Sequence, residues 1–257
     1  EKRVVHMDIS IWVVVLLGVT GFVAGVINTL AGGGSNLTLP ALMILGLPAD
    51  IANATNRVGV FMQSLVGVRG FHQHNQLPKH DLKGILVPVL TGGLVGSVLA
   101  SFIPATFLKP ILLVTMVSMS VVILIRPATV FPSPDEHSKC VQESPKSWWI
   151  LFVSGIYGGF VQAGVGFVLI AAIAGGLRYD LVKTNALKML CTAAFTIVAL
   201  AVFIVRGQVA WLPGFILAIA TMAGARLGVR LAMKVSQRFM KWFLLLMTLA
   251  ASLAALL

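Results

Sequence analysis

The sequence predicts an all-α polytopic membrane protein, and three observations lead to this fold class. Hydrophobic residues make up 58% of the 257 residues and charged residues only 11%, whereas a soluble domain is about 45–50% apolar and about 25% charged. The apolar residues form long uncharged runs, such as Ile9–Ile27, Ile85–Leu108 and Trp148–Leu177. These runs do not alternate with the period of two that a membrane-spanning β-strand requires, so each is expected to be a helix.

About eight hydrophobic segments follow from these runs, four on each side of a polar stretch. The polar stretch is Arg126–Lys146, which is rich in proline, serine and charge and is expected to be a linker. The segments cover residues 9–46, 50–71, 83–103 and 107–125 before it, and residues 148–176, 180–205, 209–231 and 239–257 after it. We therefore expect a first transmembrane repeat at 1–125, a polar linker at 126–147 and a second transmembrane repeat at 148–257.

Similar landmarks occur in the same order in the two halves, which indicates an internal repeat. The matched positions are Gly21 with Gly155, Gly25 with Gly159, Asn28 with Gln162, and the string DIANATN at 50–56 with DLVKTN at 180–185. The repeat predicts that Thr55 and Asn56 occupy places equivalent to Thr184 and Asn185.

Glycines interrupt the first segment of each half, at Gly32–Gly34 and at Gly164 and Gly166. Glycine is a poor residue inside a helix and a good one at a break. The apolar pieces that follow, Leu37–Leu45 and Phe167–Ala174, are too short to cross a hydrocarbon core about 30 Å thick at about 1.5 Å per residue. We expect Ser35 or Asn36 to cap the first piece. Asp50 and Asp180 are expected as N-caps of the second segments.

The positive-inside rule chooses between two layouts of these broken segments. If each one crosses the membrane, the Lys and Arg residues at segment ends divide nine against seven, which is no bias. If each one is a re-entrant hairpin, they divide twelve against four. The hairpin layout gives each half an odd number of crossings and so predicts inverted repeats, with both termini outside and the linker inside.

The string GFVAGVINTLAGGGSNLTLPALMILGLPADIANATN, residues 21–56, resembles the opening of the sulfite exporter TauE/SafE family. The shared pattern is a glycine-rich helix, a GGG-like break, an apolar piece with a proline (Pro40), a Gly-Leu-Pro turn at 46–48 and a helix start that contains threonine. A polar turn at 74–76, repeated at 206–208, and the two-half organisation are also similar. The resemblance implies a permease of the bacterial inner membrane for a small sulfur-containing anion, sulfite or an organosulfonate.

Polar, glycine and basic residues near the breaks are the candidates for an anion site at the interface of the two repeats. Backbone N–H groups at helix starts, amide and hydroxyl donors and intramembrane cations can all replace the water around an anion. The alternative for each of them is close helix packing, helix capping or snorkelling. The candidate substrate-binding residues are Asn28, Gly32, Gly33, Gly34, Ser35, Asn36, Thr55, Asn56, Arg57, Gln162, Gly164, Gly166, Thr184, Asn185 and Lys188.

Several function classes are disfavoured by the sequence. No acidic residue lies deep in an apolar run, which argues against a cation substrate and against carboxylate-based coupling. We expect no enzyme activity, no cofactor and no bound metal, because no P-loop or nucleophile elbow occurs and the histidines at 72, 74 and 80 have a nonspecific spacing. The expected partners are a small anion and the lipid bilayer, with no nucleic acid, and a homodimer stays open. The alternatives are an anion channel or a permease for another small organic anion.

Overall fold

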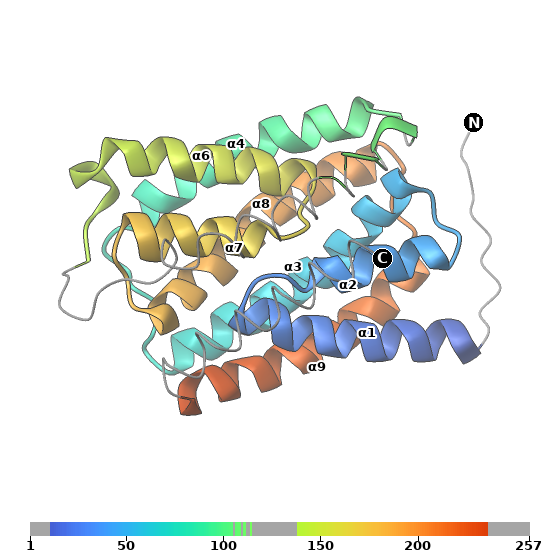
Figure 1. Ribbon diagram of the computed structural model, residues 1–257, viewed down its shortest axis with the longest axis horizontal. Helices are drawn as coiled ribbons and strands as arrows, with labels where there is room; N and C mark the ends of the chain where they lie inside the picture. Colours follow the sequence, from blue (N-terminus) through green and yellow to red (C-terminus); the bar gives the residue numbers. More distant parts are fainter. Residues whose placement is uncertain (1–10, 105, 109, 112–113, 115–137, 236–257) are drawn as a thin grey trace.

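The computed structural model describes residues 11–104, 106–108, 110–111, 114 and 138–235, and within these ranges every regular element is a helix (Figure 1). The expected segment 239–257, most of the segment 107–125 and most of the linker lie outside the described residues. The described elements are α1 Ile11–Leu30, α2 Ser35–Ile44, α3 Ala49–Gln73, α4 Leu82–Phe102, the 3₁₀ turn η2 Val141–Glu143, α6 Pro145–Phe160, α7 Val165–Ile170, the π-helix η3 Ala171–Gly176, α8 Leu181–Val205 and α9 Trp211–Lys234.

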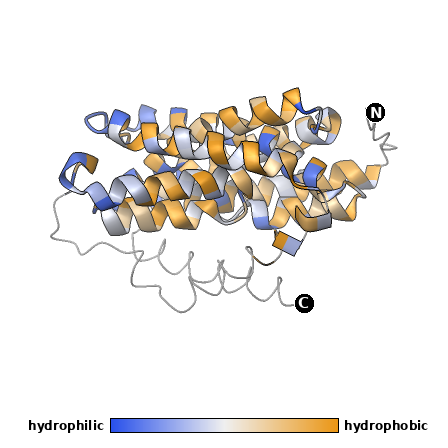
Figure 2. Ribbon diagram, turned by 90° about the horizontal axis from the view of Figure 1, so that it is seen from above, coloured by the Kyte–Doolittle hydropathy of each residue, from blue (hydrophilic) through white to orange (hydrophobic). Residues whose placement is uncertain are grey.

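Four of the described helices, α1, α4, α8 and α9, are long and apolar enough to cross a membrane. Their outer faces carry exposed large side chains such as Trp12, Val87 and Phe215, and Figure 2 shows hydrophobic residues along the length of the bundle. An apolar surface of this extent needs lipid as its solvent. The prediction of an all-α membrane protein is therefore confirmed.

Helix α3 is as long as α8, at 25 residues, but it is markedly less apolar. Six of its polar side chains are buried inside the bundle; they are Asn53, Thr55, Asn56, Arg57, Gln63 and Ser64. Since α3 packs against both α8 and α9, these helices screen it from lipid. A central, polar helix in a membrane bundle is the usual place for function.

The first helix of each half packs along a helix of the other half, α1 on α9 and α6 on α4 (Figure 1). Glycines allow the backbones to approach: a Cβ atom added at Gly155 would lie 2.5 Å from the carbonyl oxygen of Val89, and one added at Gly25 would lie 3.0 Å from the amide nitrogen of Ala225. Small residues that bring backbones together are typical of helix packing in membranes. Neither half therefore forms its core from its own residues alone.

Each broken segment turns back toward the end of the bundle where it began. At the end of α2, Ala41 and Leu42 pack in one cluster with Val13 and Leu17 at the start of α1. In the other half, a Cβ added at Gly176 would lie 3.3 Å from the Ser147 hydroxyl, so the end of η3 returns to the start of α6. Both short apolar pieces therefore end beside the start of the helix that precedes them.

Helices α3 and α8 end in the same kind of turn. Gln76 N–H donates to the Phe71 carbonyl at 3.0 Å, and Gln208 N–H donates to the Phe203 carbonyl at 2.9 Å. The residue before each glutamine, Asn75 or Gly207, has a positive φ of 56° or 66°. These are Schellman motifs, which close the C-terminus of a helix with a left-handed residue.

The two predicted aspartate caps differ in outcome. Asp180 is the N-cap of α8, and its carboxylate accepts from the N–H groups of Val182 at 3.1 Å and Lys183 at 2.9 Å, which confirms the prediction. The prediction for Asp50 is wrong. Helix α3 begins directly after Pro48, so Asp50 lies within the first helical turn.

Three connecting segments meet at the end of the bundle that holds the last residues of the linker. Lys139 N–H donates to the Leu177 carbonyl at 2.8 Å, and Val141 N–H donates to the buried Asp81 carboxylate at 2.7 Å. The Tyr179 hydroxyl lies 3.0 Å from His80 Nε2. Burial and, second, the nearby charge of Asp81 raise the pKa of Tyr179 to about 12.

Candidate functional site

The two glycine breaks touch each other in the middle of the bundle. Gly32 has a φ of +95°, and a Cβ atom added to it would lie 2.5 Å from the Cα atom of Gly166. A Cβ added to Gly166 would clash in the same way with the backbone of Gly32. The two residues are equivalent by the spacing that matches Gly21 with Gly155, so the contact joins one position of the first half to the same position of the second.

The start of α2 presents unpaired backbone donors. Within the described residues, the N–H groups of Gly33, Gly34 and Ser35 have no acceptor, although all of these residues are buried. The N-cap is Gly34, and no side chain caps the helix. The prediction that Ser35 or Asn36 is the cap is therefore wrong, because both lie in the first turn of α2 with their side chains directed elsewhere.

Asn28 on α1 lies against this helix start. A Cβ added to Gly34 would be 2.8 Å from the Cβ of Asn28, so α1 and the start of α2 are in direct contact. Asn28 is 6% exposed, and its amide makes no hydrogen bond with another described residue. The half-buried Asn36 also has a side-chain oxygen without a partner there. The amide of Asn28 thus lies beside the free N–H groups.

A chain of hydrogen bonds ends at the same place. The Thr38 hydroxyl donates to Asn56 Oδ1 at 2.6 Å, and Asn56 Nδ2 donates to the Ser35 hydroxyl oxygen at 3.1 Å. Because Ser35 Oγ accepts this bond and finds no acceptor of its own among the described residues, its proton is free to bind a ligand. These hydrogen bonds fix the Ser35 hydroxyl as a donor at the N-terminus of α2.

Arg57 binds a helix C-terminus, in contrast to the donors at the N-terminus of α2. Its guanidinium donates to the carbonyls of Gly158 at 2.9 Å, Gly159 at 2.6 Å and Phe160 at 3.3 Å, which are the last carbonyls of α6. Asn53, one turn earlier on α3, donates to the Phe160 carbonyl at 3.0 Å. A cation at a helix C-terminus neutralises the negative end of the helix dipole.

Lys188 and Asn185 of α8 cap the C-terminus of α1 in the same way. Lys188 Nζ donates to the Thr29 carbonyl at 3.1 Å and to Asn185 Oδ1 at 2.7 Å, and Asn185 Nδ2 donates to the Leu30 carbonyl at 3.2 Å. Leu30 is the last residue of α1 and Phe160 the last of α6. Each half therefore supplies an asparagine and a cation that cap the broken helix of the other half.

The second break has a left-handed turn of its own. Gln162 and Gly164 have positive φ values of 64° and 69°, and α7 starts directly after Gly164. Gln162 Nε2 donates to the Thr196 hydroxyl at 3.2 Å, while its buried Oε1 atom has no partner among the described residues. The ring of Phe167 lies against Gly33, since a Cβ there would be 2.7 Å from the ring.

Thr55 and Thr184 are buried but their hydroxyls are engaged away from the breaks. The Thr55 hydroxyl accepts from Ala210 N–H at 3.0 Å, just before α9, and the Thr184 hydroxyl donates to the Tyr179 carbonyl at 3.1 Å. The sequence pairs Asn56 with Asn185, but in the structure Asn53 is the residue that does in the first half what Asn185 does in the second, which is to donate to the last carbonyl of a broken helix. Asn53, Thr38 and Thr196 are not among the residues predicted from the sequence.

The charge around the breaks is positive. Arg57 and Lys188 are 0% and 1% exposed and bind carbonyl groups, whereas Arg226 is exposed. The carboxylates within the described residues lie outside or at the ends of helices, at Asp50, Asp81, Glu143 and Asp180. No group of His, Cys, Asp and Glu side chains in this part of the chain could hold a metal ion.

The sequence is similar to a family of membrane proteins. The family profile described as "Sulfite exporter TauE/SafE" matches residues 17–255. A "Probable membrane transporter protein" of Haemophilus influenzae is 29% identical over 228 residues, which cover 88% of this chain and 87% of that protein. The "Probable membrane transporter protein YfcA" of Escherichia coli K12 is 28% identical over 88% of this chain and 84% of its own length.

A third relative, the "Probable membrane transporter protein ORF9" of a Sinorhizobium species, is 24% identical over 97% of this chain and 94% of its own length. No solved structure is significantly similar to the chain.

Proposed function

The chain belongs to the sulfite exporter TauE/SafE family of integral inner-membrane transporters, and from this premise we propose that it exports a small sulfur-containing anion, sulfite or an organosulfonate. The proposed binding site is the start of α2, between the two breaks. The observation that carries the proposal is the group of buried, unpaired donors at Gly33, Gly34 and Ser35. Oxyanions are bound by such donors at helix N-termini.

The two ends of the broken helices explain why this site is selective for anions. At each break a C-terminal helix end, which attracts cations, lies near an N-terminal end, which attracts anions. Lys188 and Asn185 occupy the carbonyls of α1, and Arg57 and Asn53 occupy those of α6. The N-terminal end of α2 is left free, so the net field there favours negative charge.

The candidate residues have different roles in this proposal. Asn28, Ser35 and Asn36 contact the anion through side chains, and Gly33 and Gly34 through backbone N–H groups. Gly32 and Gly166 hold the two breaks together. Asn56 orients the Ser35 hydroxyl, Gln162 faces the second break, and the cations supply positive potential.

Inverted repeats account for the symmetry of these contacts. The contact of Gly32 with its counterpart Gly166, and the equal roles of Asn53 and Asn185, are what a two-fold axis between two halves would produce. In this proposal the halves rock against each other about the breaks and expose the anion to one side and then the other.

Membrane potential can drive export without a coupling ion. An anion gains about 2.3 kcal/mol per charge per 100 mV when it leaves a negative interior. With Asp50, Asp81, Glu143 and Asp180 at helix ends or outside helices, the described interior offers no carboxylate to bind a proton or sodium ion. The proposal therefore expects electrogenic efflux.

Counterflow in proteoliposomes tests the proposal. Labelled sulfite and taurine are expected to exchange against the unlabelled compounds, with saturation, and imposed potentials are expected to change net flux. Ser35→Ala and Asn28→Leu should raise the half-saturating concentration, because each removes one donor. Ser154→Ala is the matched control, since this buried hydroxyl on α6 bonds only to the Ile150 carbonyl within the described residues.

The possible outcomes separate the alternatives. Flux without saturation would identify a channel, and exchange of carboxylates but not sulfur oxyanions would identify another organic anion permease. If Ser35→Ala and Asn28→Leu transport like Ser154→Ala, the anion does not bind at the start of α2.

A further inference from the structure

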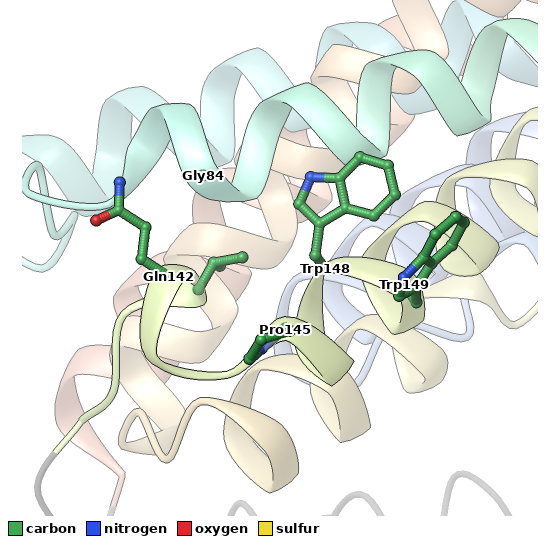
Figure 3. A pocket seen from close by; sticks show the side chains of 6 residues that line it. Gly84, Gln142, Pro145, Trp148 and Trp149 are labelled. Atoms are coloured by element: carbon green, nitrogen blue, oxygen red, sulfur yellow. The ribbon is translucent and has the colours of Figure 1, made fainter.

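A cavity of about 320 Å³ lies beside the last residues of the linker, away from the glycine breaks. Its lining residues come from three elements and are Gly84 of α4, Val141 and Gln142 of η2, and Pro145, Trp148 and Trp149 of α6. Figure 3 shows the Trp148 ring pointing from α6 toward α4 and Gln142 on the other side of the cavity. The volume is within the range of about 300–1,000 Å³ that small-molecule sites occupy.

The walls of this cavity are largely aromatic and apolar. The Trp148 ring is held in place by a stacked contact with Phe152, at 5.5 Å between centroids, and an edge contact with Trp149, at 4.9 Å. Tryptophan is enriched at the level of the lipid headgroups, where one side of the ring is apolar and the other is wet. Both tryptophans lie in the first turns of α6, where a helix of this bundle would enter the membrane.

The cavity continues into the surface that faces lipid. Trp149 is 62% exposed, and Ile150 and Val153 follow it on the exposed side of α6, while Val87 is exposed on α4. An acyl chain can therefore reach the cavity from the bilayer without leaving an apolar environment.

Two exposed lysines adjoin the lining residues. Lys83 precedes Gly84, and Lys146 follows Pro145. Two carboxylates lie nearby: Asp81 Oδ2 accepts from Val141 N–H at 2.7 Å while its Oδ1 lies against Gly84, and Glu143 accepts from Cys140 N–H at 3.1 Å. Within the described residues neither carboxylate forms an ion pair with Lys83 or Lys146. The lysine ammonium groups, on long flexible stems, are left to bind an anion at the rim.

We propose that this cavity binds an anionic phospholipid, with the acyl chain against Trp148 and Trp149 and the phosphate between Lys83 and Lys146. Basic residues beside a membrane-spanning helix attract anionic lipids. The lipid would join α4 to the start of α6, and so would stabilise the end of the bundle where the linker meets the second half.

Native mass spectrometry of the full chain in detergent, titrated with phosphatidylglycerol or phosphatidylcholine of the same acyl length, tests the proposal. The expected result is preferential retention of phosphatidylglycerol. Lys83→Gln with Lys146→Gln should reduce this preference by about 25-fold, at about fivefold for each lysine. The matched control is Lys79→Gln with Lys234→Gln, which removes two exposed lysines that adjoin no lining residue and should change the preference by less than twofold.

Two further measurements separate the contribution of the acyl chains from that of the headgroup. Trp148→Ala should weaken binding of both lipids, because it removes the wall that the acyl chains share. Glycerol phosphate, which has the headgroup chemistry without the chains, should bind far more weakly than phosphatidylglycerol. Equal loss of preference in the two double variants, or equal binding of glycerol phosphate and lipid, would overturn the proposal.

Discussion

The contact between the two breaks can be tested with four glycine-to-alanine substitutions that separate backbone strain from steric contact. Gly18 has neither, since a Cβ there meets nothing within 4 Å. Gly46 has a φ of +90° but open space around it, Gly166 has the contact without a positive φ, and Gly32 has both. The four variants therefore form an internally controlled series.

The expected costs follow from these features. Alanine at a left-handed φ costs about 1–2 kcal/mol, and an added methyl group in a closed contact costs about 1–3 kcal/mol. Gly46→Ala should show the first cost, Gly166→Ala the second, and Gly32→Ala their sum of about 2–5 kcal/mol. Gly18→Ala should stabilise α1 by about 0.5–1 kcal/mol, because alanine favours the helix.

Thermal unfolding of the detergent-purified variants, followed by circular dichroism, measures the series. At about 2–4 °C per kcal/mol for a chain of this size, Gly32→Ala should lower the midpoint by about 4–20 °C. The double variant with Gly166→Ala should differ from the sum of the single effects, since the two positions touch. Equal shifts for Gly32→Ala and Gly46→Ala would refute the contact between the breaks.

Three other predictions concern charged and titratable groups. Arg57→Met should lower the unfolding midpoint more than Lys188→Met, because Arg57 binds three backbone carbonyls and Lys188 one. Removing one partner of a buried charged contact costs about 3–5 kcal/mol of stability. Equal shifts of the midpoint would contradict the assigned contacts. Cys140, half-buried in the linker, should react with a membrane-impermeant maleimide in inverted vesicles and not in right-side-out ones, whereas the buried Cys191 should stay unmodified. Labelling from the other side would contradict the predicted topology, in which the linker is inside. Since the pKa of Tyr179 is raised from 10.0 to about 12, its neutral form stabilises the protein below pH 10 and this stability is lost as the pH rises toward 12. Tyr179→Phe should remove that part of the alkaline decline in melting temperature, and an unchanged decline would contradict it.

Among the described residues, helix positions were predictable from the sequence to within about three residues, because the long apolar runs and the glycine interruptions carry the signal. Helix α4 begins at Leu82 and α8 at Leu181, close to the expected starts at 83 and 180. Helix α6 begins three residues before the expected 148, since Pro145 suits the first turn of a helix and starts it inside the polar linker.

The direction of side chains was not predictable in the same way. Ser35 is expected from sequence as a cap, but the turn at Gly32 leaves Gly34 in that position and directs Ser35 to Asn56. Asn53 was missed because the halves were matched at their DIANATN and DLVKTN strings. Matching them instead at the polar turns, where Gln76 corresponds to Gln208, aligns Asn53 with Asn185 and was available from the sequence.

The partners of the two buried cations could not be predicted from the sequence either. That Arg57 and Lys188 are intramembrane charges was visible in the sequence, but their partners are carbonyls more than 100 residues away in the chain. Such partners carry no residue-type signal, since every residue has a carbonyl. Only the fold, which brings α3 to the end of α6 and α8 to the end of α1, determines them.

The caps across the two halves also set an order of events during synthesis. The carbonyls of Thr29 and Leu30 are closed by side chains that lie 159 and 155 residues later in the chain. When the first helix enters the membrane, its broken end therefore has no final partner, and it must wait in the bilayer or the insertion machinery until α8 has been translated. Biogenesis of this protein is thus a process in which the first half is completed by the second, and a fragment that ends before α8 leaves the carbonyls of Thr29 and Leu30 without these partners.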